Sequence, residues 1–221
     1  MEGTYRRIEP QIETRPDSLQ RLAKQSLTWV LYAKRRLNQY ELCEAVSFEP
    51  SAEPREDSQS YTLKDIFDAC CSLLYLEDNI VRPIHYSVKE YFTPSHSRMP
   101  MRATGIVDHA RAASAYLATT CLSYLLYKGL GQMPYRDMIN LVMGKVVAFP
   151  LCYYAAWYFD EHVVEADHRV PDLDELLCAF LNSSAVRLAT VLQLRYLQLT
   201  DFSPSYMSLQ WIKAFYTSTK K

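Results

Sequence analysis

The five histidines have the widest chemical repertoire in this chain, because an imidazole can act as a general base or a metal ligand near neutral pH. They are spread along the sequence, and only His162 and His168 lie close to each other. A spacing of six residues puts these two side chains on different sides of a helix, which disfavours a shared metal ion. Acidic neighbours instead indicate a solvated, acidic helix end, and we predict no metal site here.

The placement of glycine excludes a phosphate-binding loop of the usual ATPase type. Such a loop needs glycines because backbone amides must approach the phosphates without intervening side chains. The one glycine–lysine pair, Gly144-Lys145, has no glycine five residues earlier and is followed by valine. The sequence also lacks the motifs of zinc proteases, serine hydrolases and nucleophilic cysteines. These observations predict a non-catalytic protein without a cofactor.

Charge and apolar runs argue against a membrane protein or a strong polyanion binder. The chain has 24 Lys+Arg and 25 Asp+Glu, so its net charge of -1 gives no long-range attraction to phosphates or anionic lipids. Its six cysteines are scattered without CxxC pairs, as is typical of free thiols in a reducing compartment. The longest apolar run, 146–159, is too short to cross a bilayer of about 30 Å, and the first residues lack a signal-peptide core. We expect a cytoplasmic protein.

Three short helices are predicted in the first third of the chain. Apolar residues at intervals of three and four predict a helix that begins near Asp17. Asn38 followed by Glu41 has the spacing of a capping box, which predicts the start of a second helix. Thr62 followed by Asp65 repeats this pattern and predicts a third helix. The polar, proline-containing segment 49–60 between the last two helices is predicted to be a loop.

A β-hairpin is predicted directly after the third helix. Two short apolar runs, 73–76 and 80–85, flank the polar turn Glu77-Asp78-Asn79. Pro83 in the second run cannot donate a backbone hydrogen bond, so we expect that strand to lie at an edge. Three helices followed by a hairpin is the element order of a winged helix. We therefore predict a winged-helix domain over 1–93, with an N-terminal lead-in.

The remainder, 94–221, is predicted to be an all-helical domain. An alanine-rich apolar stripe follows Gly105, and further helices are predicted near 149–164, from Pro171, over 184–199 and over 204–217. The aromatic segment 153–159 covers all helix faces, so we interpret it as core rather than as a ligand-binding site. The predicted fold class is thus mainly α, a winged helix followed by a helical domain.

Six segments in the first four fifths of the chain resemble one family. In chain order they are TYRRIEPQIE, LAKQSLTWVLYAKRRLNQYELCEAV, DIFDACCSLL, VRPIHYSVKEYF, ATTCLSYLLY and FPLCYYAAWYFDEH. Their order and spacing resemble the fungal NACHT proteins of the STAND signalling ATPases, which often carry C-terminal ankyrin repeats. The resemblance covers residues 5–182. It implies the winged-helix and helical region that follows the nucleotide-binding domain in these NLR-like proteins.

The resemblance also implies a partner and a site residue. The partner would be a NACHT ATPase domain, in cis in the parent architecture or in trans. His85 lies in an HYS motif near the position where related ATPases sense bound nucleotide, so it is the candidate sensing residue when a NACHT partner is present. An exposed apolar face on the helix near Asp17 would indicate where this partner docks.

Nucleic-acid binding is the alternative hypothesis, because many winged helices read DNA. The candidate contacts are the basic turn Lys34, Arg35 and Arg36 and, on the third helix, Lys64. A short charge run between helices is usually a solvated connection, which is how we interpret this turn. The third helix also carries two aspartates beside Lys64, and these would repel the phosphates. We therefore expect no nucleic acid and no membrane among the partners.

Overall fold

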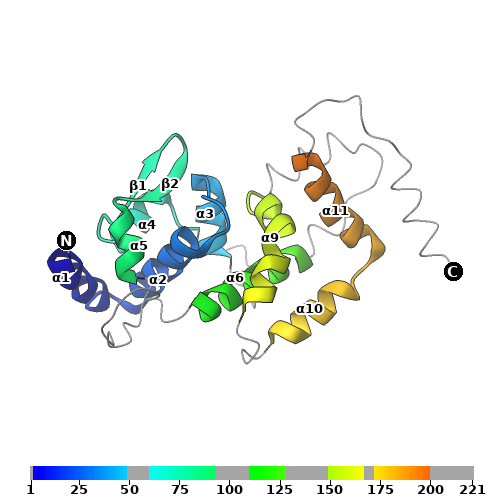
Figure 1. Cartoon of the computed structure of the whole chain (residues 1–221), viewed down its shortest axis with the longest axis horizontal. Coiled ribbons are helices and arrows are strands. Elements are labelled where there is room, and N and C mark those ends of the chain that lie inside the picture. Colours follow the sequence, from blue (N-terminus) through cyan, green and yellow to red (C-terminus); the bar gives the residue numbers. More distant parts are fainter. Residues whose placement is uncertain (1, 49–59, 93–109, 128–148, 167–171, 200–221) are drawn as a thin grey trace.

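A computed structural model describes residues 2–48, 60–92, 110–127, 149–166 and 172–199. This part of the chain is mainly helical, with one small antiparallel sheet (Figure 1). Before residue 93 the elements are α1 (Glu2–Glu13), α2 (Asp17–Tyr32), α3 (Gln39–Ser47), α4 (Leu63–Ala69), β1 (Leu74–Glu77), β2 (Ile80–Pro83) and α5 (Tyr86–Phe92). After it they are α6 (Ala110–Leu126), α9 (Cys152–Glu165), α10 (Leu173–Leu181) and α11 (Ala185–Leu199).

Several predictions fall on residues outside these ranges. They are the loop at 49–59, the domain boundary between 93 and 94, His168, Pro171 and the helix at 204–217. Below, the N-terminal part means residues 2–92, and the helical part means residues 110–199.

Both predicted capping boxes are confirmed. The Asn38 side chain accepts hydrogen bonds from the backbone N–H groups of Tyr40 and Glu41, both at 2.9 Å, and Glu41 accepts from the Asn38 N–H at 3.0 Å. Thr62 and Asp65 make the corresponding pair of bonds at the start of α4. These bonds satisfy N–H groups that have no partner within the helix, so they fix where α3 and α4 begin.

The predicted hairpin is also confirmed. β1 and β2 pair antiparallel from Leu74 opposite Pro83 to Glu77 opposite Ile80. The turn residues Asp78 and Asn79 have φ values of 50° and 66°, the left-handed pair that suits a two-residue hairpin turn. Aspartate and asparagine tolerate this conformation better than most residues.

β2 is an edge strand of this two-stranded sheet, as Pro83 predicts, and the first half of its outer side is also covered. The segment between α2 and α3 runs along its other side, where the Val81 N–H donates to Leu37 O at 3.1 Å and the Gln39 N–H donates to Asn79 O at 3.0 Å. Asn38 and Ile80 form an isolated bridge between these two bonds. Pro83 lies beyond this pairing, where its missing N–H removes no ladder bond.

α1 was not predicted from the sequence, which suggested only a lead-in. Pro10 lies inside the helix, where proline normally weakens helix formation. Tyr5 and Ile12 nevertheless share one face and are buried, with Ile8 half-buried between them. The helix packs against α2 and α5, so tertiary contacts outweigh the local cost of Pro10.

α2 is the centre of the N-terminal part. Its residues Leu22, Ala23, Leu27 and Trp29 are 0% exposed, and the helix packs against α1, α3, α4 and α6. The exposed apolar face that would have marked a docking site on this helix is therefore not present: the face is buried within the chain itself.

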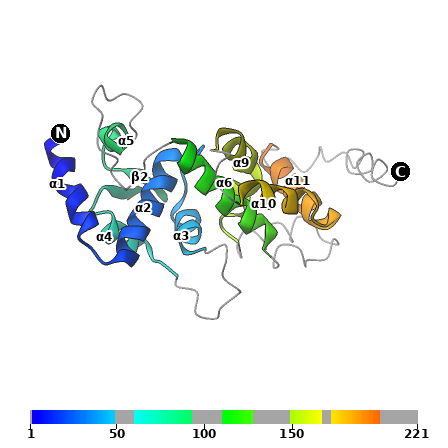
Figure 2. The same ribbon diagram turned by 90° about the horizontal axis from the view of Figure 1, so that it is seen from below.

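α6 joins the two parts. Figure 2 shows it between α2 and α3 on one side and α9, α10 and α11 on the other, and it contacts α2, α9 and α10. Its small residues Ala113 and Ala118 are buried together with Leu117 and Cys121, so neighbouring helices can approach it closely. One continuous apolar core extends from α1 to α11 through this helix.

Among the described residues, no single helix has both the length and the apolar character needed to span a bilayer. α10 and the segment Ala185–Arg195 of α11 reach that length and apolar character only when they are taken together. The chain bends by 98° between them.

Candidate functional site

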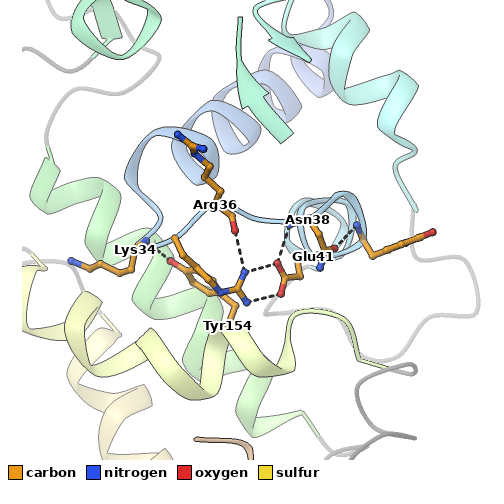
Figure 3. A network of polar contacts seen from close by, with 7 residues as sticks. Lys34, Arg36, Asn38, Glu41 and Tyr154 are labelled. Atoms are coloured by element: carbon orange, nitrogen blue, oxygen red, sulfur yellow. Dashed lines mark hydrogen bonds and ion pairs between the residues drawn. The ribbon is translucent and has the colours of Figure 1, made fainter. Parts of the chain in front are cut away.

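A dense cluster of charged and polar groups lies at the place where the two parts meet. We call it the joint, and Figure 3 shows the part of it around Glu41 and Tyr154. Its members are Lys34, Arg35, Asn38 and Glu41 from the turn after α2 and the start of α3, and Tyr154, His162 and Glu165 from α9. α2 ends at Tyr32 because Ala33 adopts an extended conformation, and this sends the basic turn across α9.

An ion pair between Arg35 and Glu41 forms the N-terminal side of the joint. The Arg35 guanidinium donates to both carboxylate oxygens of Glu41, at 2.8 and 2.7 Å. Glu41 is only 5% exposed and also accepts the Asn38 N–H of the capping box. A buried carboxylate is stable only when its oxygens are bonded, so Arg35 and the cap depend on each other.

Tyr154 connects this pair to α9. Its ring lies 5.3 Å from the Arg35 guanidinium and 5.3 Å from the Trp29 ring, which meets it edge to face. Its hydroxyl accepts the backbone N–H of Lys34 at 2.9 Å and lies 2.8 Å from His162 Nε2. Burial, followed by the nearby Cys121 thiol, raises the pKa of Tyr154 well above its ordinary value, so the phenol stays protonated.

His162 completes the joint and corrects the sequence interpretation, which expected a solvated acidic helix end. The side chain is 0% exposed. Burial, followed by the Lys34 ammonium, lowers its pKa to about 4, so the imidazole is neutral near pH 7. The signal for burial was present in the sequence: Tyr154, Tyr158 and His162 are spaced by four residues and therefore share one face of α9.

Lys34 adds an ion pair with Glu165 at the rim of the joint. Glu165 also accepts a hydrogen bond from the Ser114 hydroxyl of α6 at 3.3 Å. The hydrogen bond from Lys34 lowers the pKa of Glu165 below its ordinary range. A second contact between the parts lies outside the joint, where the Tyr124 hydroxyl donates to Glu44 at 2.8 Å and its ring meets that of Phe48 at 5.0 Å.

The structure separates the basic residues that the sequence proposed as a nucleic-acid surface. Lys34 and Arg35 are half-buried and engaged with Glu165 and Glu41, so the interpretation of the turn as a solvated connection is wrong for both. The cause is their position between α3 and α9. Arg36 is exposed, and Figure 3 shows its side chain directed away from the joint while its carbonyl accepts from Arg35 at 3.1 Å. Lys64 is exposed on α4.

His85 lies in a different cluster, which we call the corner. It consists of Tyr5 and Glu9 from α1, His85 directly before α5, and Ser87 and Tyr91 of α5. The Tyr5 hydroxyl lies 2.8 Å from the Ser87 hydroxyl, and the Tyr91 hydroxyl donates to Glu9 at 2.8 Å. The corner thus ties the start of the chain to the helix that follows the hairpin.

The hydrogen bonds of His85 determine which ring nitrogen carries its proton. The backbone N–H of Ser87 donates to Nδ1 at 3.2 Å, and the Ser87 hydroxyl lies 2.7 Å from the same nitrogen. A backbone N–H can only donate, so Nδ1 is an acceptor and the neutral ring carries its proton on Nε2. His85 is half-buried, and no hydrogen bond to Nε2 is present within the part of the chain that the structure describes.

Neither cluster has the geometry of a metal centre. Within the described ranges, no group of three or more histidine, cysteine, aspartate or glutamate side chains is placed to hold an ion. The joint holds the two parts together through buried charges, and the corner presents one half-buried histidine with a donor nitrogen.

Comparison with known proteins gives one limited relationship. No protein-family model matches the chain, and no solved structure matches it. The azaphilone pigments biosynthesis cluster protein L of Monascus ruber is 29% identical over 188 residues, which cover 80% of this chain and 37% of that protein. The chain therefore spans little more than a third of the length of this curated relative.

Proposed function

We propose that the chain is a non-catalytic regulatory module of a NACHT-type signalling ATPase, which packs against a nucleotide-binding core and couples its nucleotide state to signalling. The core would be supplied in cis within a longer protein or in trans. Three lines of reasoning support this proposal: the arrangement of the N-terminal part, the position of His85 and the joint.

The observation that carries the proposal is the arrangement of α2, α3, α4 and the hairpin. We infer that these elements form a winged helix, with β1 and β2 as the wing. The pairing of Leu37 to Gln39 with β2 supports this inference, because a winged helix has a short strand between its first two helices that joins the hairpin. The order of elements after the hairpin, a short helix and then a helical domain, is that of the region which the sequence resembles.

The corner supports a sensing role for His85. A histidine that donates from Nε2 is suited to a phosphate oxygen, which accepts hydrogen bonds and carries negative charge. Because the Ser87 N–H donates to Nδ1, a neutral ring with its proton on Nδ1 would lose this bond at the start of α5. The bound nucleotide would come from the partner.

The joint supports the coupling role. Ion pairs, a tyrosine bridge and a shared core connect the N-terminal part to α6 and α9, so a displacement of one part is transmitted to the other. The length of the Monascus ruber relative is consistent with a module that belongs to a larger chain.

The test is a binding measurement with a purified NACHT protein from the same organism, with and without ADP. We expect the wild-type chain to bind more tightly when ADP is present, and His85→Ala to lose this dependence. Arg36→Ala is the matched control, since Arg36 is exposed and its side chain points away from the joint. Binding that is absent, or that is the same with ADP and in His85→Ala, would contradict the proposal.

The nucleic-acid alternative predicts binding to duplex DNA through Lys34, Arg35, Arg36 and Lys64. The ion pairs of Lys34 and Arg35 disfavour it, because phosphate contact would require both pairs to break. Fluorescence anisotropy with a mixed-sequence duplex at low salt decides this point. Affinity that falls steeply with salt and is lost in Arg36→Ala together with Lys64→Ala would favour the alternative.

A further inference from the structure

His162 is a buried titratable group in a position that favours its neutral form. The side chain is 0% exposed, and its Nε2 lies 2.8 Å from the Tyr154 hydroxyl. Its Nδ1 has no hydrogen-bond partner among the described residues. An imidazolium has two N–H donors and a full charge, so both nitrogens would need acceptors for the charged ring to remain buried.

The surrounding charges are already balanced. Those facing His162 or its neighbours come from the basic turn, α3, α9 and α11, and they form three ion pairs: Lys34 with Glu165, Arg35 with Glu41, and Arg195 with Asp160 at 2.6 Å. α6 contributes neutral groups, the Ser114 hydroxyl at Glu165 and the Cys121 thiol near Tyr154. A proton on His162 would therefore add a charge without a free carboxylate to compensate it.

The hydrogen bonds of Tyr154 give the same result. Its oxygen accepts the Lys34 N–H, so its own proton is available to His162 Nε2. The Tyr154 oxygen therefore lies against both the Lys34 N–H, which joins α9 to the basic turn, and His162 Nε2. An imidazolium at this position would be a buried cation beside the Lys34 ammonium, which disfavours the closed arrangement.

We propose that the joint is a proton-operated latch, in which protonation of His162 releases α9 from the basic turn while each part keeps its helices. This inference does not depend on the proposed function. The pKa of His162 is about 4 in the closed joint, against 6.5 for the ordinary side chain, so protons bind preferentially to the open form. The stabilisation of the closed joint is complete above pH 6.5 and is lost progressively as the pH falls towards 4.

Hydrogen exchange measured by mass spectrometry at pH 7.5 and pH 5.0, corrected for intrinsic rates, tests the latch. Between these values the opening equilibrium should rise by about 30-fold, and the added exchange should appear in residues 33–38 and in α9. Protection of the α1 and α5 amides should be unchanged, as should far-UV circular dichroism. The hydrogen bond from Lys34 lowers the pKa of Glu165 below its ordinary value, so this carboxylate stays mainly charged over the interval.

His162→Gln is the matched variant, since glutamine can bond Tyr154 but does not titrate. Its protection should be the same at both pH values. If it does not fold, an NMR titration of the wild-type imidazole gives the same information, with an expected pKa near 4. The latch is refuted by unchanged protection of the wild-type joint, by simultaneous loss of protection in all helices, by an equal response in His162→Gln, or by a folded-state pKa near 6.5.

Discussion

The joint and the corner are built from the same kinds of side chain but differ in how these are used. Each contains at least one tyrosine hydroxyl, a histidine and a buried carboxylate, Glu41 in the joint and Glu9 in the corner. In the joint the carboxylate is bonded to a cation and the histidine is fully buried. In the corner, the hydroxyls of Tyr5 and Tyr91 bond Ser87 and Glu9, and His85 is half-buried.

This difference separates a structural role from a binding role. A fully buried histidine whose hydrogen bond is already formed, such as His162, can change its protonation state but cannot contact a ligand. A half-buried histidine that is fixed through Nδ1, such as His85, can bind a ligand through Nε2 without breaking the hydrogen bond that orients its ring. The comparison predicts that variants in the joint reduce stability, whereas variants in the corner change stability little.

The largest effect is expected for Arg35→Met. Removing the guanidinium leaves the 5% exposed Glu41 carboxylate without its cation, and methionine cannot replace the two hydrogen bonds. Breaking a buried pair in this way costs about 3 kcal/mol in the free energy of unfolding. Urea denaturation followed by circular dichroism measures it.

The matched control for this variant is the double substitution Arg35→Met with Glu41→Leu. Since it removes both charges, it should recover part of the loss, although the capping bond to the Asn38 N–H is also removed. If the double variant loses more free energy of unfolding than the two single variants lose in sum, the ion pair is not the source of the effect.

The next effect contrasts two tyrosines. Tyr154→Phe removes the hydrogen-bond partner of the Lys34 N–H and of His162 Nε2 at a buried site, and should cost about 2 kcal/mol. Tyr5→Phe removes one bond to Ser87, whose hydroxyl also lies beside His85, and should cost below about 1 kcal/mol. Thermal unfolding of both variants under one condition gives the comparison. If the two variants lose the same stability, the joint depends on the Tyr154 hydroxyl no more than the corner depends on the Tyr5 hydroxyl.

The local features of the fold were predictable from the sequence because their causes are local. A capping box needs two side chains three residues apart, and a hairpin turn needs two residues that accept a left-handed backbone. Asn38 with Glu41, and Asp78 with Asn79, satisfy these rules within their own segments. The positions of α3, α4 and the hairpin follow from them.

The joint was not predictable, because its partners are far apart in the sequence. The Lys34 N–H and the Tyr154 hydroxyl are separated by 120 residues, and no spacing rule links them. The basic turn therefore had the pattern of a solvated connection. The helix α1 escaped prediction for a similar reason: Pro10 weighs against it locally, and the contacts that stabilise it come from α2 and α5.

The smallest of these effects contrasts the two helix caps. Asn38→Ala removes an acceptor shared by two N–H groups beside the buried Arg35–Glu41 pair, and should cost about 1.5 kcal/mol. Thr62→Ala affects an exposed residue at the start of α4, where water can replace the lost acceptor, and should cost about 0.5 kcal/mol. Urea midpoints at an unchanged m-value measure both. If Thr62→Ala and Asn38→Ala lose the same free energy of unfolding, the strength of each cap is set within its own helix. The joint then does not strengthen the cap at Asn38.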